Sequence, residues 1–188
     1  MQKIVIIISV IIAVIAGGIW YVFSQTDTLI KQQVEQQGME YLGTKVSLGN
    51  AELSLSDGRL SLSELNVQNP QGFSQNNALS LQNITLDLGA PRGDAYVVDQ
   101  FSINLPVILY ETDSSTGSNL LTIKDHIQSK IPKKEATPAP TKTAQPMVII
   151  NNIVIADTRL KLDFSALPVG QLGVQQTTYV ITLPSFHL

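Results

Sequence analysis

The chain has 188 residues, of which 44% are hydrophobic and only 14% charged, with a net charge of −3 and no cysteine. This length suffices for one domain with a core, or for a domain and a membrane anchor, and the mean hydropathy of +0.15 indicates contact with something other than water. The small negative charge argues against nucleic acid as a partner, because phosphate neutralisation requires clustered Lys and Arg, and the lack of cysteine excludes disulfides, thiolate metal sites and thiol nucleophiles.

Residues 1–23 are predicted to be a transmembrane signal anchor. Their core, Ile4–Phe23, carries no charge, and at about 1.5 Å per residue it matches the roughly 30 Å thickness of the hydrocarbon layer. Lys3 precedes it and an aromatic pair stands near its far end, which favours an N-terminus in the cytoplasm. The alternative is a cleaved signal peptide with Ile4–Ala16 as its apolar region; the apolar run continues beyond that region, which favours a retained anchor.

Residues 24–42 are predicted to form a short amphipathic helix. Thr26-Asp27-Thr28 offers an N-cap, apolar residues then recur at broadly helical spacing, and Gly43 is a suitable stop. The helix is expected either to cover one end of the following sheet or to pack as an ordinary amphipathic element.

The next stretch has the pattern of a β-hairpin around Asp57-Gly58. A two-residue type I′ turn at this dipeptide would place Leu55 opposite Leu60 and Leu53 opposite Leu62, all on one face. The hairpin is therefore expected to present a face of leucines that another layer must cover or that lines a groove.

The apolar positions change parity farther from this turn, in both arms together. Leu48, Leu65 and Val67 are therefore expected on the opposite face of the sheet unless bulges intervene. Gly49-Asn50 and Ser63-Glu64 mark where the sheet is expected to bend or to exchange faces.

Alternating apolar residues continue in Leu79–Leu88 and Phe101–Leu109, and apolar residues at spacings of 3 and 4 predict a helix over Asn119–Ile131. A segment rich in Pro, Ala and Thr follows and is expected to be an extended linker. The expected organisation is thus a first β region with a terminal helix, a linker and a second β region, at residues 43–131, 132–146 and 147–188.

No pattern of catalytic or metal-binding residues is found. His126 and His187 are the only histidines, and neither stands in a metal-ligand spacing or beside a cluster of carboxylates. Nucleophile elbows and glycine-rich phosphate loops are also lacking in the sequence. We therefore predict no enzyme, no cofactor and no metal.

The expected fold is mainly β: after the two N-terminal helices, a twisted antiparallel sheet curves as a groove, with a closed β-sandwich as the alternative. Only two short helices are available to cover a sheet of several strands, so its apolar face either folds on itself or remains available to a ligand. Alternation alone selects the residues expected to line that face, which are Leu53, Leu55, Leu60, Leu62, Leu86, Leu88, Ile103 and Leu105.

The order of apolar segment, helix and hairpin resembles the N-terminal region of AsmA-family proteins. The residues that carry the resemblance are Gly38 and Leu42–Gly49, the hairpin Leu53–Leu62, the segment Leu65–Phe73, and the closing Leu183–Leu188, which is similar to a strand of short family members. The resemblance implies a Gram-negative inner-membrane protein projecting into the periplasm, with a sheet curved around an apolar groove, similar to the chorein-type start of bridge-like lipid transfer proteins.

The resemblance implies lipid as a ligand. TamB-like members are thought to conduct phospholipid toward the outer membrane, but at about 4.8 Å per strand this chain is too short to bridge the periplasm alone. The expectation is a single-pass inner-membrane protein that binds acyl chains in a β-groove and assists lipid transport or outer-membrane biogenesis. The alternative is a structural or accessory subunit of an envelope protein complex, with the leucines in a closed core.

Overall fold

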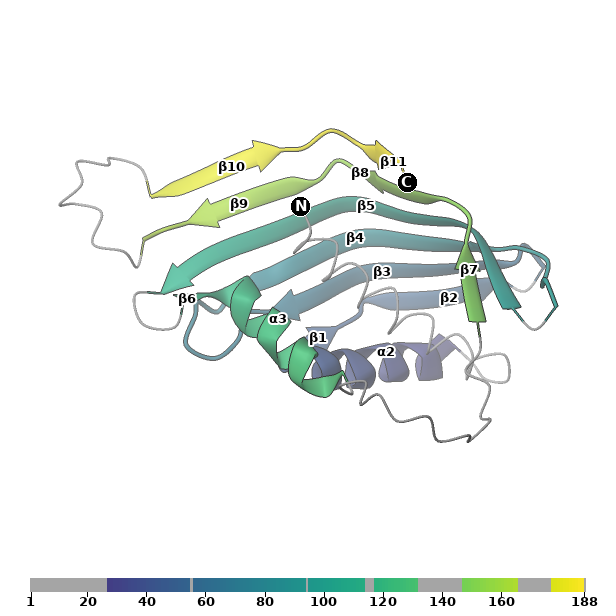
Figure 1. The fold of residues 1–188 in the computed structure, drawn as a ribbon, viewed down its shortest axis with the longest axis horizontal. Helices are drawn as coiled ribbons and strands as arrows, with labels where there is room; N and C mark the ends of the chain where they lie inside the picture. Colours follow the sequence, from purple (N-terminus) through teal and green to yellow (C-terminus); the bar gives the residue numbers. More distant parts are fainter. Residues whose placement is uncertain are drawn as a thin grey trace, which may run out of the picture.

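The structure is a computed structural model that describes residues 27–54, 56–93, 95–113, 117–131, 147–165 and 177–187. Within them, one open sheet of eleven strands bows along its length, and two helices lie against it (Figure 1). The mainly β prediction is confirmed, and the described strands form an open sheet and not a closed sandwich. The predicted anchor, 1–23, and the predicted linker, 132–146, lie outside the described residues.

The elements are α2 (Asp27–Leu42), β1 (Val46–Ser47), β2 (Asn50–Ser54), β3 (Arg59–Gln68), β4 (Asn77–Leu88), β5 (Ala95–Asp113), β6 (Gly117–Ser118), α3 (Asn119–Lys130), β7 (Met147–Ile150), β8 (Ile153–Ala156), β9 (Arg159–Asp163), β10 (Thr178–Thr182) and β11 (Phe186–His187).

The sheet is mixed, which corrects the prediction of an antiparallel one. Strands β3, β4 and β5 are antiparallel neighbours, and β1 and β2 both pair with β3. On its other side, β5 pairs in parallel with β7, β8 and β9, which follow one another along its length. Strands β10 and β11 then return antiparallel to β9 and β8. The two predicted β regions therefore belong to one sheet.

The parallel pairing follows from the connection between β5 and β7. Because β7 pairs with the first residues of β5, from Ala95 onward, the chain must return the length of a strand of 19 residues, about 60 Å. Parallel strands require such a crossover, usually one with a helix. The 12 residues of α3 supply about 18 Å of rise. The helix alone therefore cannot cover that distance.

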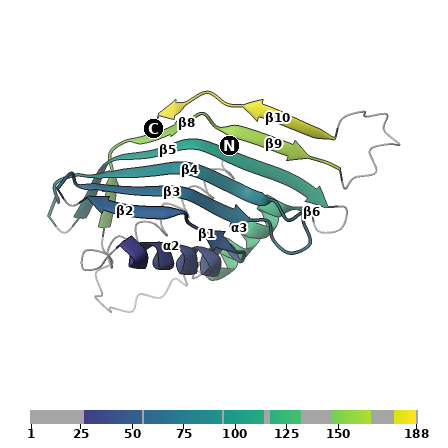
Figure 2. The same cartoon turned by 180° about the vertical axis from the view of Figure 1, so that it is seen from behind.

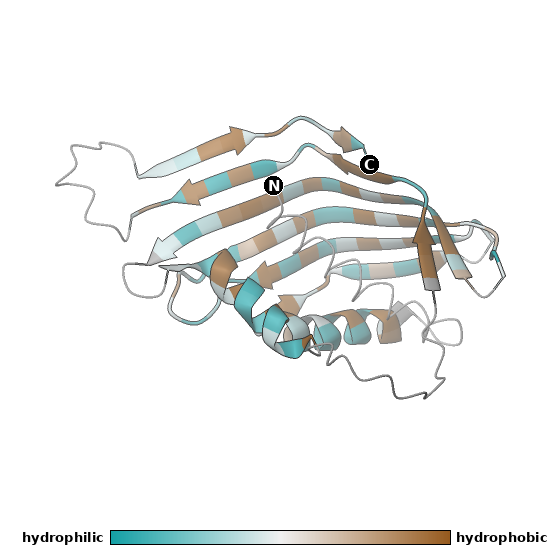
Figure 3. Cartoon of the chain, viewed as in Figure 1, coloured by the Kyte–Doolittle hydropathy of each residue, from teal (hydrophilic) through white to brown (hydrophobic). Residues whose placement is uncertain are grey.

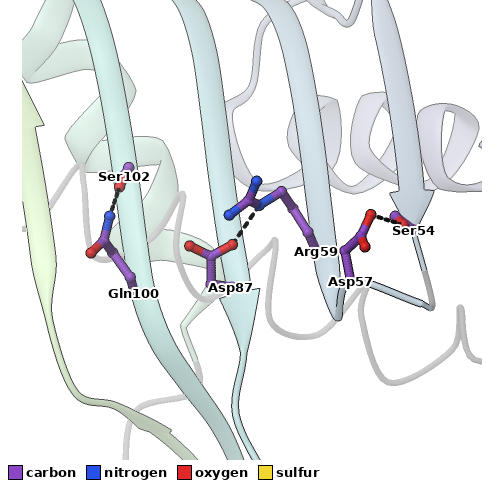
Figure 4. Close-up of polar contacts among 6 residues, drawn as sticks. All are labelled: Ser54, Asp57, Arg59, Asp87, Gln100 and Ser102. Atoms are coloured by element: carbon purple, nitrogen blue, oxygen red, sulfur yellow. Dashed lines mark hydrogen bonds and ion pairs between the residues drawn. The ribbon is translucent and has the colours of Figure 1, made fainter.

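The predicted register of the first hairpin is wrong by two residues. Leu53 lies opposite Leu60, and Ser54 lies opposite Arg59. A type I′ turn would require positive φ at both central residues, but of Asp57 and Gly58 only the glycine has one, 59°. Ser54 instead donates its Oγ hydrogen to Asp57 Oδ2 at 2.6 Å (Figure 4), which favours a longer loop. A shift of two residues leaves every side chain on its predicted face.

A row of residues crosses the sheet at one level, and three of its members have positive φ. In β3 and β5, Glu64 and Leu105 have φ of 58° and 50°, and Asp157, between β8 and β9, has φ of 56°. The pairs on both sides of the row show that Gln82 of β4 lies between Glu64 and Leu105, and that Leu105 lies beside Asp157. Gly49 continues the row beyond β3, since its N–H donates to the Ser63 carbonyl at 3.0 Å.

This row, called the reversal row below, explains the change of parity seen in the sequence. One left-handed residue within a strand turns the following side chains to the other face, as in a β-bulge. Gln82 of β4 has no positive φ, but the pairing of β3, β4 and β5 continues in the same register across the row. Leu48, Leu65 and Val67 are consequently buried in the same core as the hairpin leucines, so the bulge alternative is the correct one.

We expect Glu64→Gly to stabilise the fold by about 0.5 to 1 kcal/mol. A left-handed conformation costs a residue with a Cβ about 1 to 2 kcal/mol, and glycine removes this cost. Part of the gain is lost because glycine makes the unfolded chain more flexible. Ser63→Gly is the matched control, because Ser63 is the preceding residue of the same strand and has no positive φ; it should destabilise. The midpoint of urea unfolding measures both changes, and destabilisation by Glu64→Gly would contradict the strain assigned to this row.

Helix α2 covers the edge of the sheet formed by β1 and β2 (Figures 1 and 2). It buries Ile30, Val34 and Leu42 and ends before Gly43, whose φ of 68° is the left-handed conformation of a helix C-terminus. The end predicted at Gly43 is thus observed.

A buried polar network fixes the start of α3. Asn119 is fully buried; its Nδ2 donates to Asn69 Oδ1 at 2.8 Å and to the Leu109 carbonyl at 2.7 Å, and its Oδ1 accepts from the N–H groups of Glu111 and Leu120. The Glu111 carboxylate in turn accepts from Asn69 Nδ2 at 2.9 Å. The network therefore ties the turn after β3, the end of β5 and α3 together.

Candidate functional site

The structure brings most of the predicted apolar residues together on one face of the sheet. Leu60, Leu62, Leu86 and Ile103 are only 0 to 3% exposed, and they lie in adjacent strands, with Leu60 opposite Leu86. Leu53 and Leu88 are partly buried and pack against the same cluster.

The remaining two predicted residues are placed differently. Leu105 belongs to the reversal row, so its side chain lies on the face opposite to Ile103, where it lines a hollow together with Glu64 and Gln82. Its assignment to the apolar face was wrong, because strict alternation was carried across a residue with positive φ. Leu55 lies outside the described residues.

The predicted groove lining is part of the protein core. Ile30, Val34 and Leu42 of α2 and Ile123 and Ile127 of α3 belong to the same buried cluster as these leucines. Helix α2 contacts β1 and β2, and α3 contacts β5 and β6. The described part of the chain therefore holds these leucines in its interior, and an acyl chain would have to displace existing packing to reach them.

The apolar face continues beyond the helices, toward β8–β11, where it is exposed. Ile181 lies opposite Leu160 of β9, and Leu160 lies beside Ile108 of β5, which packs against the core. Phe186 lies opposite Ile155, which lies beside Ile103. The apolar colouring of these strands is visible in Figure 3.

Sequence reasoning missed this exposed part. Tyr179 and Ile181, alternate residues of β10, are 39% and 43% exposed, and Phe186 of β11 is 43% exposed. Their alternation resembles that of the buried strands, so the pattern carries no sign that β10 and β11 form the outer edge. We refer to Tyr179, Ile181 and Phe186 as the edge patch.

The opposite face of the sheet carries a cavity of about 450 Å³ at the reversal row. Arg159 stands in it with the carboxylates of Glu64 and Asp157, over an apolar floor that includes Leu105 and Val107. All three charged residues are exposed, and among the described residues no side-chain hydrogen bond fixes them. The arrangement lacks the fixed polar groups of a specific binding site.

The rest of that face carries polar pairs, both between strands and along one strand (Figure 4). Arg59 of β3 donates its Nε hydrogen to Asp87 of β4 at 2.6 Å, and Gln100 of β5 donates to Ser102. The hydrogen bond with Asp87, followed by the attraction of its charge, raises the pKa of Arg59 above its ordinary value. Both partners of the ion pair are solvent-accessible, so it marks a solvated face and not a buried charge site.

His126 has a structural environment. Its Nε2 lies 3.2 Å from the Glu40 carbonyl near the end of α2, and its ring packs so closely over Gly43 that a Cβ there would lie 2.5 Å from it. The residue therefore joins α3 to the end of α2. Within the described ranges, no group of three or more His, Asp or Glu side chains is placed to hold a metal ion.

Comparison with known proteins adds no relative: no family model and no curated protein matches the sequence. Within the part of the chain that the structure describes, neither helix has the length and apolar character needed to cross a membrane.

Proposed function

We propose that this protein is an AsmA-like protein, anchored in the inner membrane by Ile4–Phe23, that binds lipid acyl chains on the apolar face of its periplasmic sheet and assists lipid transport or outer-membrane biogenesis. The observation that carries the proposal is the edge patch. It exposes aromatic and β-branched side chains on the same face as the core, on an open sheet.

The edge patch is better suited to acyl chains than the hairpin leucines are. Acyl-chain binding has no directional requirement and scales with the apolar area that leaves water. Side chains that are already 0 to 3% exposed have almost no such area left, whereas Tyr179, Ile181 and Phe186 retain about two fifths of theirs. The lipid contact we propose is therefore moved from the hairpin to the last two strands.

A second candidate function is a structural or accessory role in an envelope protein complex. The near-complete burial of Leu60, Leu62 and Leu86 favours it, because a closed core needs no ligand. In that case a partner protein covers the edge patch, and lipid does not copurify with the domain.

A photo-crosslinking residue at Phe186 in the full chain in cells tests the proposal. We expect phospholipid adducts, identified by mass spectrometry, at several times the yield found with the same residue at His187. That neighbour in β11 is also exposed but points to the other face. Adducts to proteins alone, or equal lipid yields at both positions, would refute lipid binding at this face and leave the accessory role.

A further inference from the structure

We propose that two copies of this chain pair edge to edge through β10, antiparallel and centred on Val180, so that their sheets continue into one another across a two-fold axis. This proposal concerns an interface between copies and does not depend on the ligand of the apolar face.

The backbone of β10 has one side available for a further strand. The Phe164 N–H donates to the Thr177 carbonyl at 2.9 Å, and the Leu183 N–H donates to the Thr158 carbonyl at 2.9 Å. In an antiparallel ladder this pattern alternates, so the odd-numbered residues of β10 bond to β9 and the even-numbered ones direct their N–H and C=O groups away from it. Within the described residues, β9 is the only strand that pairs with β10.

The hydrogen bonds that the interface requires belong to Val180, because two Val180 residues opposite each other exchange both N–H···O=C bonds. Thr182 would meet Thr178 of the other copy, which already takes part in another interaction, so no hydrogen bond is assigned to that pair. Val180 is 61% exposed, the largest value among the exposed large apolar residues of the described chain. It is thus the natural centre of a contact.

The other edge of the sheet shows how this fold protects an edge. There α2 lies along β1 and β2, Glu35 Oε1 accepts from the Leu48 N–H at 2.8 Å, and Lys31 donates to the Gly49 carbonyl at 3.1 Å. β10 has no charged residue and no proline, the features that normally protect an edge strand. No described helix or strand covers its outer side, and an edge strand of this composition is a template for pairing.

The sequence of β10 fits a second copy of itself. Thr178-Tyr179-Val180-Ile181-Thr182 reads nearly the same in both directions. With Val180 opposite Val180 of the other copy, Tyr179 faces Ile181 and Thr178 faces Thr182 on each side of the axis. Aromatic with β-branched, and Thr with Thr, are favourable cross-strand pairs. No like charges meet, and each copy presents the same surface, as a two-fold contact requires.

Pro184 limits the register. It is the next residue after Thr182 whose backbone would be directed outward, and proline has no N–H to donate. Pairing is therefore confined to β10, and the interface is small. A contact of this size gives a weak dimer that depends on concentration. Because Tyr179 and Ile181 lie on the core side of the sheet, the two apolar faces would join at the axis.

The absence of cysteine from the chain allows a clean test by disulfide formation. In the proposed pairing the two Val180 Cα atoms are hydrogen-bonded partners about 5.5 Å apart, within the range of roughly 4.4 to 6.8 Å that a disulfide spans. The two Thr182 Cα atoms are displaced by four residues, about 13 Å along the strand. With the full chain in detergent under mild oxidation, Val180→Cys should give covalent dimer at least about tenfold faster than Thr182→Cys.

Equal rates for the two cysteine variants, or no covalent dimer from Val180→Cys, would refute the proposal. A second measurement needs no covalent bond: light scattering gives the mass of the full chain in solution over a range of concentrations. Val180→Pro should abolish dimers without loss of fold, because the N–H that it removes points away from β9. Ile181→Pro is the matched control, since it removes an N–H that bonds to β9 and should release β10. Dimers that persist in Val180→Pro, or a parent chain that is monomeric at all concentrations, would also overturn it.

Discussion

Leu60→Asp is expected to unfold the domain and not merely to empty a binding groove. Leu60 is 3% exposed, lies opposite Leu53 and Leu86, and belongs to the cluster that includes both helices. A carboxylate placed there loses its hydration and finds no partner, so we expect a loss of about 4 kcal/mol or more in the free energy of unfolding. The loss should appear in urea unfolding followed by circular dichroism.

Thr85→Asp is the control for this substitution. Thr85 pairs with Ser61 and Ser102 on the polar face of the same strands, so the same carboxylate should cost less than about 1 kcal/mol there. A Leu60→Asp protein that stays as stable as this control, but no longer copurifies with lipid, would show that the leucines line an open groove after all. The substitution thus separates the two arrangements that the sequence left open.

Alternation along the chain identified the long strands β3 and β4 and the middle of β5, and it showed which face of them is apolar. It succeeded for Leu62, Leu86 and Ile103 because their strands are flanked on both sides, so that one face is buried throughout. It failed for Leu105, where positive φ reverses the pleat. Glutamate and leucine are not typical residues for that conformation, and the only sign of the reversal row was the simultaneous change of parity in both arms of the hairpin.

The parallel half of the sheet was missed for a different reason. Each strand of the second β region has a normal pattern, but a pattern does not tell which strand is its neighbour. The informative feature was the connection in the sequence: a helix and then a long segment predicted to be extended fit a crossover, whereas antiparallel neighbours need only a short turn. The exposure of β10 was hidden likewise, because central and edge strands of this composition look alike in sequence.

Asn119→Ala is expected to destabilise the protein by about 3 kcal/mol, although it changes one amide. The substitution leaves the Glu111 N–H and the Leu109 carbonyl without their partners inside the protein, and each buried unsatisfied group costs about 1 to 3 kcal/mol. Gln128→Ala, at an exposed position of the same helix, should be nearly neutral. Thermal unfolding of the two variants against the parent chain measures the difference.

Asn119→Asp distinguishes the loss of hydrogen bonds from the loss of packing. The introduced carboxyl has nearly the shape of the amide, but when ionised it has no hydrogen to give to Asn69 Oδ1 or to the Leu109 carbonyl, and it lies in the same network as the Glu111 carboxylate. A protonated carboxyl at position 119 can donate one hydrogen, so the folded state favours the protonated form and raises the pKa of this carboxyl. The variant is therefore more stable at low pH, and this stability is lost as pH rises. The penalty relative to the parent chain should therefore be smaller at pH 4 than at pH 7. A penalty independent of pH would mean that Asn119 acts mainly by filling space, and that the network does not hold α3 to the end of β5.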